Sequence, residues 1–587
     1  MSLSDTTPIP FTEHLQSPLD AFHWSRAAIT TYPGVVFKAW GVGMTVFLGV
    51  IGAGLLTLWL MLKRVEIRVG HGSAEWATRE QIVNAGLLDT PPSGTSLIVG
   101  GWIDPKAGKN AKPEYLIHNG PESIAFYAPS GSGKTVAVVI PNLLCYESSA
   151  FVLDIKGELW SATAGYRRQE LHQRVLFHDP SSSDPAGARF NPLDEVNITL
   201  DTAVREVQMI AEYLVPTTSG KSENVHFEQS ARSLMVGVLL YELSKAHEEE
   251  TGTTTSIPAV LSEVTSPDRK FKTYLGEMID FKTGHPAIAR AIREIAMEMN
   301  DREEREFSGI FSSMVTPLAK FRDPILAHAT SCSDFRIMDL VDNEKPVTLY
   351  LTIRPNERDR LKDYFGLLVN LILRRMTQDI HVDGQSRREL LLMLEEFTSL
   401  PALPVVQQSM DVMRGYAIKA FIVLQDIESL IALYGQNETF TSNSKIQVAY
   451  TPSKPKTAKL LSEMVGTTTI TEHTAGKQRK ILSPIASSEN ESEAVHSRPL
   501  LTADEILRLG VPVINADYRM TEPGEALIFS RGCFPIRGVQ TPYFMDPELL
   551  RRSKIPPPDV SDRTINDKAQ DNTPPTNTDA VAAVAHA

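Results

Sequence analysis

Residues 126–144, FYAPSGSGKTVAVVIPNLL, restrict the fold of this chain more than any other part of its sequence. A glycine- and serine-rich turn separates a short apolar run from a longer one, which is the order of a buried strand, a tight loop and a helix. Gly131 and Gly133 let backbone N–H groups turn inward toward an anion. Lys134 adds a positive charge, and the Thr135 hydroxyl is suited to bind Mg²⁺. The stretch therefore predicts a phosphate-binding loop at the edge of an α/β sheet.

The pattern departs from a general P-loop only at its first position, where alanine stands for glycine. A chance Gly/Ser turn ending in Lys-Thr is the alternative, and the flanking strand and helix patterns argue against it. Pro141 lies inside the following helix, so we expect a kink there. The candidate phosphate-binding residues are Ala128, Pro129, Ser130, Gly131, Ser132, Gly133, Lys134 and Thr135.

Short apolar runs alternate with helical patterns along much of the chain, which is typical of parallel strands buried on both faces. This alternation predicts a doubly wound α/β domain. The predicted strands are residues 123–127, 149–153, 174–178, 347–353, 390–394 and 418–424.

Two glutamates follow the apolar run 390–394, at the end of a strand where open α/β sheets bind their ligands. We assign Glu395 to the metal shell, together with Thr135, and Glu396 to the activation of water. The alternative is a pair of solvated glutamates at a strand exit. The nearby phosphate-binding loop favours the catalytic interpretation.

Three further positions have two interpretations each. Gln425 ends the strand 418–424, where its amide either contacts the γ-phosphate or the attacking water, or is an ordinary strand terminus. Arg414 either reaches the nucleotide of a neighbouring subunit or is a surface arginine. Asp154 follows another strand and either faces the same site or, with Lys156, caps a turn.

Residues 39–62 contain no charged side chain, and as a helix they would extend about 36 Å, enough to cross a bilayer. Trp40 and Trp59 lie near the two ends, where indole rings favour the headgroup region. Basic residues flank both ends, with a weak bias that puts the C-terminal part in the cytoplasm. The sequence predicts a transmembrane helix here, and a buried core helix is the alternative.

Composition limits the remaining classes. The net charge of −13 argues against a surface coated in nucleic acid but allows a local basic channel. The three cysteines form no CxxC pair, so we expect reduced thiols, no disulfide frame and no zinc site. The expected organisation is an N-terminal tail (1–38), a transmembrane helix (39–62), a juxtamembrane segment with the first part of the nucleotide-binding domain (63–194), an inserted all-α domain (195–345), the second part of the nucleotide-binding domain (346–550) and a disordered tail (551–587).

In combination, these motifs resemble the type IV secretion coupling proteins of the TraG/VirD kind, the inner-membrane ATPases of bacterial conjugation, and most of all the TraG-like proteins of plasmids. The likeness spans roughly residues 70–550. It rests on GSAEWAT (72–78), HNGPESIAFYAPSGSGKTVAVVIPNLL (118–144), DIKGELWSATAGYRR (154–168), FNPLDE (190–195), EQSARSLMVGVLLYEL (228–243), EEFTSL (395–400), GYAIKAFIVLQDI (415–427) and TAKLLSEMVGTTTI (457–470).

The resemblance implies a RecA-like P-loop ATPase domain with an inserted all-α domain, assembled as a homo-hexamer in the inner membrane. It implies that Lys134 and Thr135 bind ATP and Mg²⁺. Glu395 and Glu396 match the family's acidic pair, Gln425 its third-motif glutamine, and Arg414 the arginine-finger position of some members. The implied partners are single-stranded DNA with its relaxase and the secretion channel proteins.

The sequence departs from the family pattern in two ways. The acidic pair is usually Asp-Glu and here is Glu-Glu, which places the rate of hydrolysis in question. Relatives commonly have two N-terminal membrane helices, and only one is predicted here. The alternatives to an ATP-driven motor are therefore a membrane docking receptor with weak or no ATPase activity, and a general DNA translocase of the same superfamily.

Overall fold

The computed structural model describes residue 30 and residues 33–64, 72–108, 111–184, 186–215, 224–249, 255–377, 388–400, 402–477, 489–516 and 519–565. The chain divides into two units, Met1–His71 and Gly72–Ala587. Most of the predicted N-terminal tail and residues 566–587 lie outside the described residues.

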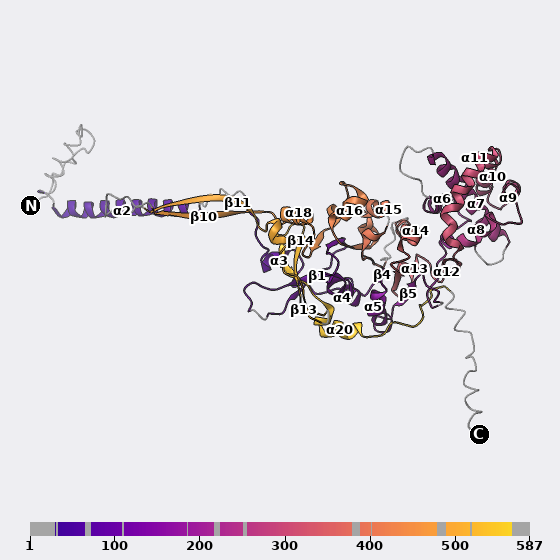
Figure 1. Cartoon of the computed structure of the whole chain (residues 1–587). Coiled ribbons are helices and arrows are strands. Elements are labelled where there is room, and N and C mark those ends of the chain that lie inside the picture. The colour runs from indigo at the N-terminus through magenta and orange to yellow at the C-terminus, as the bar shows by residue number, and fades with distance from the viewer. Residues whose placement is uncertain are drawn as a thin grey trace, which may run out of the picture. The chain divides into compact units, whose positions relative to one another are not determined.

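The first unit contains helix α2, Pro33–Arg64, which includes the whole apolar stretch 39–62 (Figure 1). Large apolar side chains along it are exposed, among them Val42 at 66% and Phe47 at 61%. No helix in the described part of the chain has the length and apolar character of a membrane span. The predicted transmembrane segment is therefore helical, while its relation to a membrane stays a prediction.

An eleven-stranded mixed sheet forms the centre of the second unit, in the order β2-β1-β15-β14-β9-β3-β8-β7-β4-β6-β5. Seven strands, from β9 to β5, are parallel, and four antiparallel strands extend the sheet beyond β9. The strands are β1 (Leu97–Trp102), β2 (Glu114–His118), β3 (Ile124–Tyr127), β4 (Ser149–Asp154), β5 (Arg174–His178), β6 (Val347–Thr352), β7 (Leu390–Leu394), β8 (Ile418–Leu424), β9 (Ile446–Ala449), β14 (Glu525–Ser530) and β15 (Ile536–Val539). All six predicted strands are confirmed.

Alternate side chains of the parallel strands enter two separate cores, one on each face of the sheet. Phe151 and Leu153 of β4 contribute to the larger core, and Ala150 and Val152 to the smaller one. The smaller core also holds α3 (Arg79–Asn84), α4 (Ile140–Cys145), α5 (Glu158–Gln169) and α20 (Pro547–Ser553). This two-sided burial explains why the parallel strands are continuous apolar runs in the sequence.

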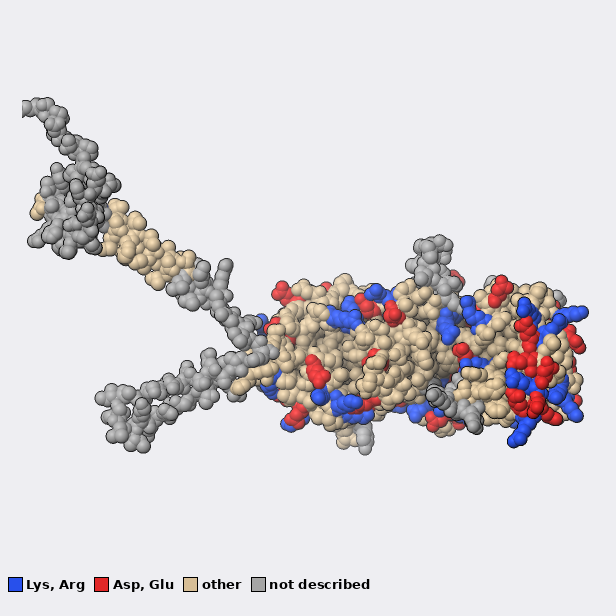
Figure 2. Space-filling model, turned by 90° about the horizontal axis from the view of Figure 1, so that it is seen from above, with Lys and Arg blue, Asp and Glu red and all other residues tan. Residues whose placement is uncertain are grey.

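Helices without strands occupy the described residues between the short helix Pro192–Glu195 and β6, and several of them gather together in Figure 1. They are α6 (Ala203–Leu214), α7 (Asn224–Glu248), α8 (Ile257–Val264), α9 (Phe271–Asp280), α10 (Pro286–Asn300), α11 (Glu304–Val315), α12 (Pro324–Ala329) and α13 (Asp339–Asp342). On the face shown in Figure 2, acidic and basic side chains alternate over this region. Ion pairs within this region include those of Arg302 with Glu298 and Glu306.

The remaining elements follow the helical region in sequence. The helices are α14 (Arg358–Met376), α15 (Pro404–Ser409), α16 (Ile427–Tyr434), α17 (Phe440–Asn443), α18 (Pro455–Val465) and α19 (Ala503–Ile506). Two antiparallel hairpins complete the fold: β10 (Thr467–Lys477) with β11 (Glu489–Pro499), and β12 (Val513–Ile514) with β13 (Met520–Glu522).

The C-terminal segment is ordered further than the sequence predicts. The prediction of a disordered tail from residue 551 is wrong up to residue 565, because α20 continues to Ser553 and a strap of residues 556–565 follows. Asp562 accepts a hydrogen bond from the backbone N–H of Val175 at 2.9 Å, and the Ser561 hydroxyl accepts one from Phe177 at 2.9 Å. These side chains satisfy donors on the outer edge of β5, which explains the order of a segment with few apolar residues.

Candidate functional site

The phosphate-binding loop lies between β3 and the helix that follows it, as predicted. Gly131 and Gly133 have φ values of +78° and +82°, the left-handed region that favours glycine. Thr135–Val139 forms one turn of π-helix, closed by the N–H of Ile140 on the Thr135 carbonyl, before α4 begins. The predicted irregularity near Pro141 thus takes the form of a π turn just before the proline.

The predicted metal ligands are brought together. The Thr135 hydroxyl donates a hydrogen bond of 2.5 Å to Oε1 of Glu395, which follows β7 directly. Glu395 is only 6% exposed, and this burial raises the pKa of its carboxyl group to about 7. The hydrogen bond from Thr135 and the charge of Lys134 lower this pKa, and the nearby carboxylates of Glu158 and Asp154 raise it. A cation at this position would relieve both the burial and the like-charge repulsion.

The second glutamate contacts the loop lysine. Oε1 of Glu396 lies 3.6 Å from Nζ of Lys134, which is 6% exposed and has no hydrogen-bond partner among the described residues. Glu396 has a φ of +52°, a sparsely populated conformation for a side chain other than glycine. Strained residues of this kind cluster at functional sites, and this conformation is what turns Glu396 toward the lysine after the strand ends.

Gln425 also lies at this edge of the sheet. The N–H of Ala128, the first residue of the loop, donates a 2.9 Å hydrogen bond to the carbonyl of Leu424. Gln425 comes immediately after that carbonyl and is half-buried. The end of β8 and the start of the loop are therefore in direct contact, and both interpretations of Gln425 remain open.

Arg414 lies at the other end of the strands. It belongs to the short helix Met413–Tyr416 that precedes β8, so the length of this strand separates it from the phosphate-binding loop of its own chain. A pocket of about 350 Å³ lies there, lined by Arg414, Lys445, Arg531 and other residues. Within one chain the structure does not bring Arg414 to Lys134.

Three contacts from the C-terminal strands support the loop, and nothing in the sequence pattern indicates them. The buried Gln540 donates a 3.1 Å hydrogen bond from Nε2 to the carbonyl of Ser132, and its Oε1 accepts one from Gly524. Thr541 donates to the carbonyl of Ala137. Cε of Met520 lies so close to Gly133 that a Cβ there would meet it at 2.5 Å. The pairing of β15 with β1 brings Gln540 and Thr541, some 400 positions away in sequence, to this loop.

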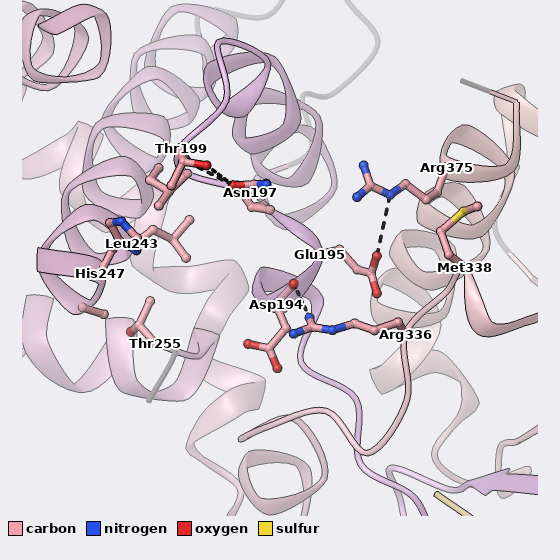
Figure 3. A pocket seen from close by; sticks show the side chains of 13 residues that line it. Asp194, Glu195, Asn197, Thr199, Leu243, His247, Thr255, Arg336, Met338 and Arg375 are labelled. Atoms are coloured by element: carbon pink, nitrogen blue, oxygen red, sulfur yellow. Dashed lines mark hydrogen bonds and ion pairs between the residues drawn. The ribbon is translucent and has the colours of Figure 1, made fainter. Parts of the chain in front are cut away.

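A further pocket lies elsewhere in the described residues (Figure 3). It encloses about 720 Å³ and is lined by residues that include Asp194, Glu195, His247, Arg336 and Arg375. Figure 3 shows Glu195 and Arg375 pointing toward one another within its lining, with Oε2 of Glu195 3.9 Å from Nε of Arg375. None of the predicted site residues lines this cavity, so it is a feature separate from the phosphate-binding loop.

The residues of the loop and of the strand ends fit a nucleoside triphosphate with Mg²⁺. The left-handed glycines open the loop backbone, and the buried Lys134 ammonium has no hydrogen-bond acceptor of its own in the described structure. Thr135 and Glu395 supply adjacent oxygen ligands, which Mg²⁺ prefers. A phosphate and a divalent cation would satisfy both groups at once.

Comparison with known proteins supports this interpretation. The chain matches the family described as Type IV secretory system Conjugative DNA transfer over residues 71–576. It is 35% identical to the conjugal transfer protein TraG of Escherichia coli, over 94% of this chain and 89% of TraG. It is 26% identical to protein VirD4 of Agrobacterium fabrum (strain C58), over 82% of this chain and 67% of VirD4.

A solved structure shares the fold. The plasmid coupling protein TrwB, in complex with the non-hydrolysable ATP analogue ADPNP, matches with a TM-score of 0.53 at 14% identity, over 80% of this chain and 93% of the TrwB chain. At this identity the match concerns the fold alone. Together with the large mixed sheet, it fits the predicted RecA-like α/β class.

Proposed function

The chain belongs to the type IV secretory system conjugative DNA transfer family, and we propose that it is an ATP-hydrolysing coupling protein of such a system. It would recruit DNA–relaxase complexes, protein substrates, or both, and deliver them to the secretion channel. One observation carries the enzymatic part of this proposal. Within the phosphate-binding loop, whose glycines have left-handed backbone conformations, Thr135 contacts Glu395 and Lys134 contacts Glu396.

Each residue has a separate task in this proposal. Backbone N–H groups of the loop hold the β- and γ-phosphates, and Lys134 neutralises charge on them. Thr135 and Glu395 would hold Mg²⁺, and the ion would supply positive charge against the negative charge that develops on the phosphates. Glu396 orients the attacking water and accepts its proton, and Gln425 hydrogen-bonds to the same water or to the γ-phosphate.

Arg414 would complete the site of a neighbouring protomer in a homo-hexamer. Because it lies at the amino-terminal end of β8, only a second copy of the chain would place it near a γ-phosphate. There its guanidinium group would stabilise the charge of the transition state.

We assign α2 to the inner membrane. The exposed apolar side chains along this helix gain free energy when hydrocarbon covers them. The ground for a membrane span is the uncharged sequence 39–62, not a span recognised in the described structure. The second unit would then lie in the cytoplasm, where it meets ATP and the DNA substrate. Lysines and arginines facing the pore of the ring would bind DNA phosphates without reading bases, so single-strand affinity should fall steeply with salt.

ATP hydrolysis by the full-length protein in detergent, with and without single-stranded DNA, tests the motor function. A Lys134→Ala variant should lose nucleotide binding and hydrolysis, and full activity in this variant would refute the proposal. The proposed role of Arg414 is tested by mixing two inactive variants, Lys134→Ala and Arg414→Ala. If the arginine acts across subunits, random mixing restores both groups at about one quarter of the interfaces, and activity returns.

A docking receptor with weak hydrolysis is the second candidate, because Glu395 stands where the family usually has aspartate. The extra methylene changes where the carboxylate can lie relative to a metal held by Thr135, whose hydroxyl oxygen keeps its lone pairs while it donates to Glu395. A Glu395→Asp variant that gains activity strongly would favour this candidate. An unchanged or lower rate would favour the motor.

A further inference from the structure

Asp154 is the last residue of β4, the strand beside β7. In the register of this pair, Leu153 lies opposite Leu394, so Asp154 lies beside the position where β7 continues into Glu395. Neighbouring parallel strands lie about 4.8 Å apart. Asp154 and Glu395 are therefore adjacent at the carboxyl edge of the sheet.

Strand alternation puts Asp154 on the same face as the phosphate-binding loop. Ala150 and Val152, which precede it at intervals of two, belong to the smaller core. Val138 and Leu143, from the helix that follows the loop, belong to that same core. Because side chains two residues apart share a face, Asp154 points to the side of the sheet that carries Thr135 and Lys134.

The two oxygens of Asp154 have different surroundings. Oδ2 accepts a 2.8 Å hydrogen bond from the backbone N–H of Trp160 in the first turn of α5. Oδ1 has no hydrogen-bond partner in the described part of the chain, although the residue is fully buried. The N–H groups of Leu159 and Gly157 are also near this carboxylate, but the geometric hydrogen bond is the one from Trp160 to Oδ2, which the amide of an asparagine would accept equally well.

A second unsatisfied oxygen lies next to it. Thr352 is paired with Asp154 across β4 and β6, and it has the same alternation on its own strand, where Tyr350 enters the smaller core. Its hydroxyl is buried and also lacks a hydrogen-bond partner among the described residues. Two buried polar groups without partners, side by side on one face, indicate a missing hydrogen-bonding species, since such groups are costly to bury alone.

We propose that Asp154 is a positioning residue for the metal site, and that its Oδ1 accepts a hydrogen bond from a water molecule of the Mg²⁺ shell, with the Thr352 hydroxyl as a second contact. The inference rests on the proposed nucleotide function. Mg²⁺ keeps several of its water ligands in protein sites, so a carboxylate further from the metal than Glu395 can accept a hydrogen bond from one of these waters. Outer-shell carboxylates of this kind orient the metal's own ligands.

The charge distribution agrees with this role. Asp154 and Glu395 are neighbours here, whereas the two nearby lysines pair with other carboxylates, Lys134 with Glu396 and Lys156 with Glu158. Without a cation the corner is repulsive, and a divalent cation reverses the balance. This explains how burial of a half-satisfied carboxylate is tolerated beside another carboxylate.

The test is a titration of Mg²⁺ in the presence of a fluorescent ATP analogue, with the full-length protein in detergent. Asp154→Asn preserves the cap on α5 because its amide oxygen still accepts from Trp160. We expect the Mg²⁺ concentration for half-saturation to rise about 10-fold or more, while affinity for the analogue in EDTA stays unchanged or improves. Thr352→Val should shift the same titration in the same direction by less.

Asp179→Asn is the matched control. Asp179 also follows a strand at this edge, one strand beyond β6, but both of its oxygens have partners, Ser181 and Arg354. Its Mg²⁺ titration should match that of the wild type. Asp154→Ser, which also caps helices, replaces the asparagine variant if that protein does not fold.

Two outcomes would overturn the inference. A folded Asp154→Asn protein with a wild-type Mg²⁺ titration would show that Oδ1 does not act on the metal. Equal weakening with and without Mg²⁺ would show a structural effect on the loop. Failure of the proposed function is seen separately, as a Lys134→Ala variant that still binds the analogue with Mg²⁺ at wild-type affinity.

Discussion

Replacement of Lys134 by methionine should change stability in opposite directions with and without nucleotide. The ammonium group is 6% exposed and has no hydrogen-bond partner in the described structure. A buried donor left unsatisfied costs ~1–3 kcal/mol. The ion pair with Glu396, at 3.6 Å, offsets ~1 kcal/mol of this cost, and Glu396, whose side chain is 17% exposed, stays partly hydrated when the lysine charge is removed. Lys134→Met, which keeps the length of the side chain, should therefore stabilise the nucleotide-free protein by ~0–2 kcal/mol.

The same change removes the charge-assisted hydrogen bonds to phosphate, worth ~1.5–3 kcal/mol each. Loss of one such bond weakens nucleotide binding by about 10- to 150-fold. At saturating Mg²⁺ and ATP analogue the wild type should gain melting temperature, and the variant should gain little. Without nucleotide, the variant should melt up to about 2 °C above the wild type.

Differential scanning calorimetry of the full-length protein, with and without the analogue, measures both quantities. Lys156→Met is the control, because Lys156 is an exposed lysine near the same edge of the sheet, with a side chain that is 57% exposed. It should change neither melting temperature. If Lys134→Met lowered the nucleotide-free melting temperature by several degrees, the ammonium would be stabilising the empty loop, and the reasoning from its missing partner would be refuted.

Three further predictions concern the fold around the site. Burial lowers the pKa of His118 to about 4, so between pH 6.5 and pH 4 the unfolded chain takes up a proton that the folded chain does not. The free energy of unfolding should therefore fall toward pH 4 by up to ~1.4 kcal/mol per pH unit. In melting experiments at different pH values, His118→Asn should show a smaller loss over that range. Gln540→Leu leaves the Ser132 carbonyl without its side-chain donor, so we expect the free energy of unfolding to fall by ~1–3 kcal/mol, measured by melting. The variant should also bind the ATP analogue more weakly in a fluorescence titration. Asp562→Ala removes the acceptor for the Val175 N–H, so limited proteolysis should cut the strap 556–565 faster than in the wild type, and equal rates would refute its role in fixing the strap.

The parallel part of the fold was predictable because burial on both faces makes each strand a continuous apolar run. β4 and β7 are recognisable from composition alone for this reason. Glu395 was predictable because it follows β7 at the carboxyl edge, where any P-loop must also lie. Its hydrogen bond to Thr135 is the direct consequence of that shared edge.

The antiparallel extension of the sheet was not predictable by the same reasoning. β1 and β15 contain glycines, and although each pairs with a strand nearby in sequence, their pairing with each other joins residues as far apart as Gly101 and Val539, which no local pattern indicates. The support of the loop by Gln540 depends on this long-range pairing. The order of the strap 556–565 comes from side-chain oxygens that cap the edge of β5, a contact that hydrophobic periodicity does not register.

The two ends of the parallel strands have different chemistry, and this difference bears on how hydrolysis and transfer are linked. The carboxyl ends hold Thr135 and Glu395, with buried polar groups that a nucleotide and metal would satisfy. The amino ends hold Arg414 and Lys445, which directly precede β8 and β9, with the side chain of Arg414 exposed. A site that needs both ends cannot be completed within one chain. In the proposed hexamer each hydrolysis event would therefore require two protomers in contact. A change in that contact would reach the sheet of the protomer that supplies Arg414 through β8, which begins near Arg414 and ends just before Gln425, beside that protomer's own phosphate-binding loop.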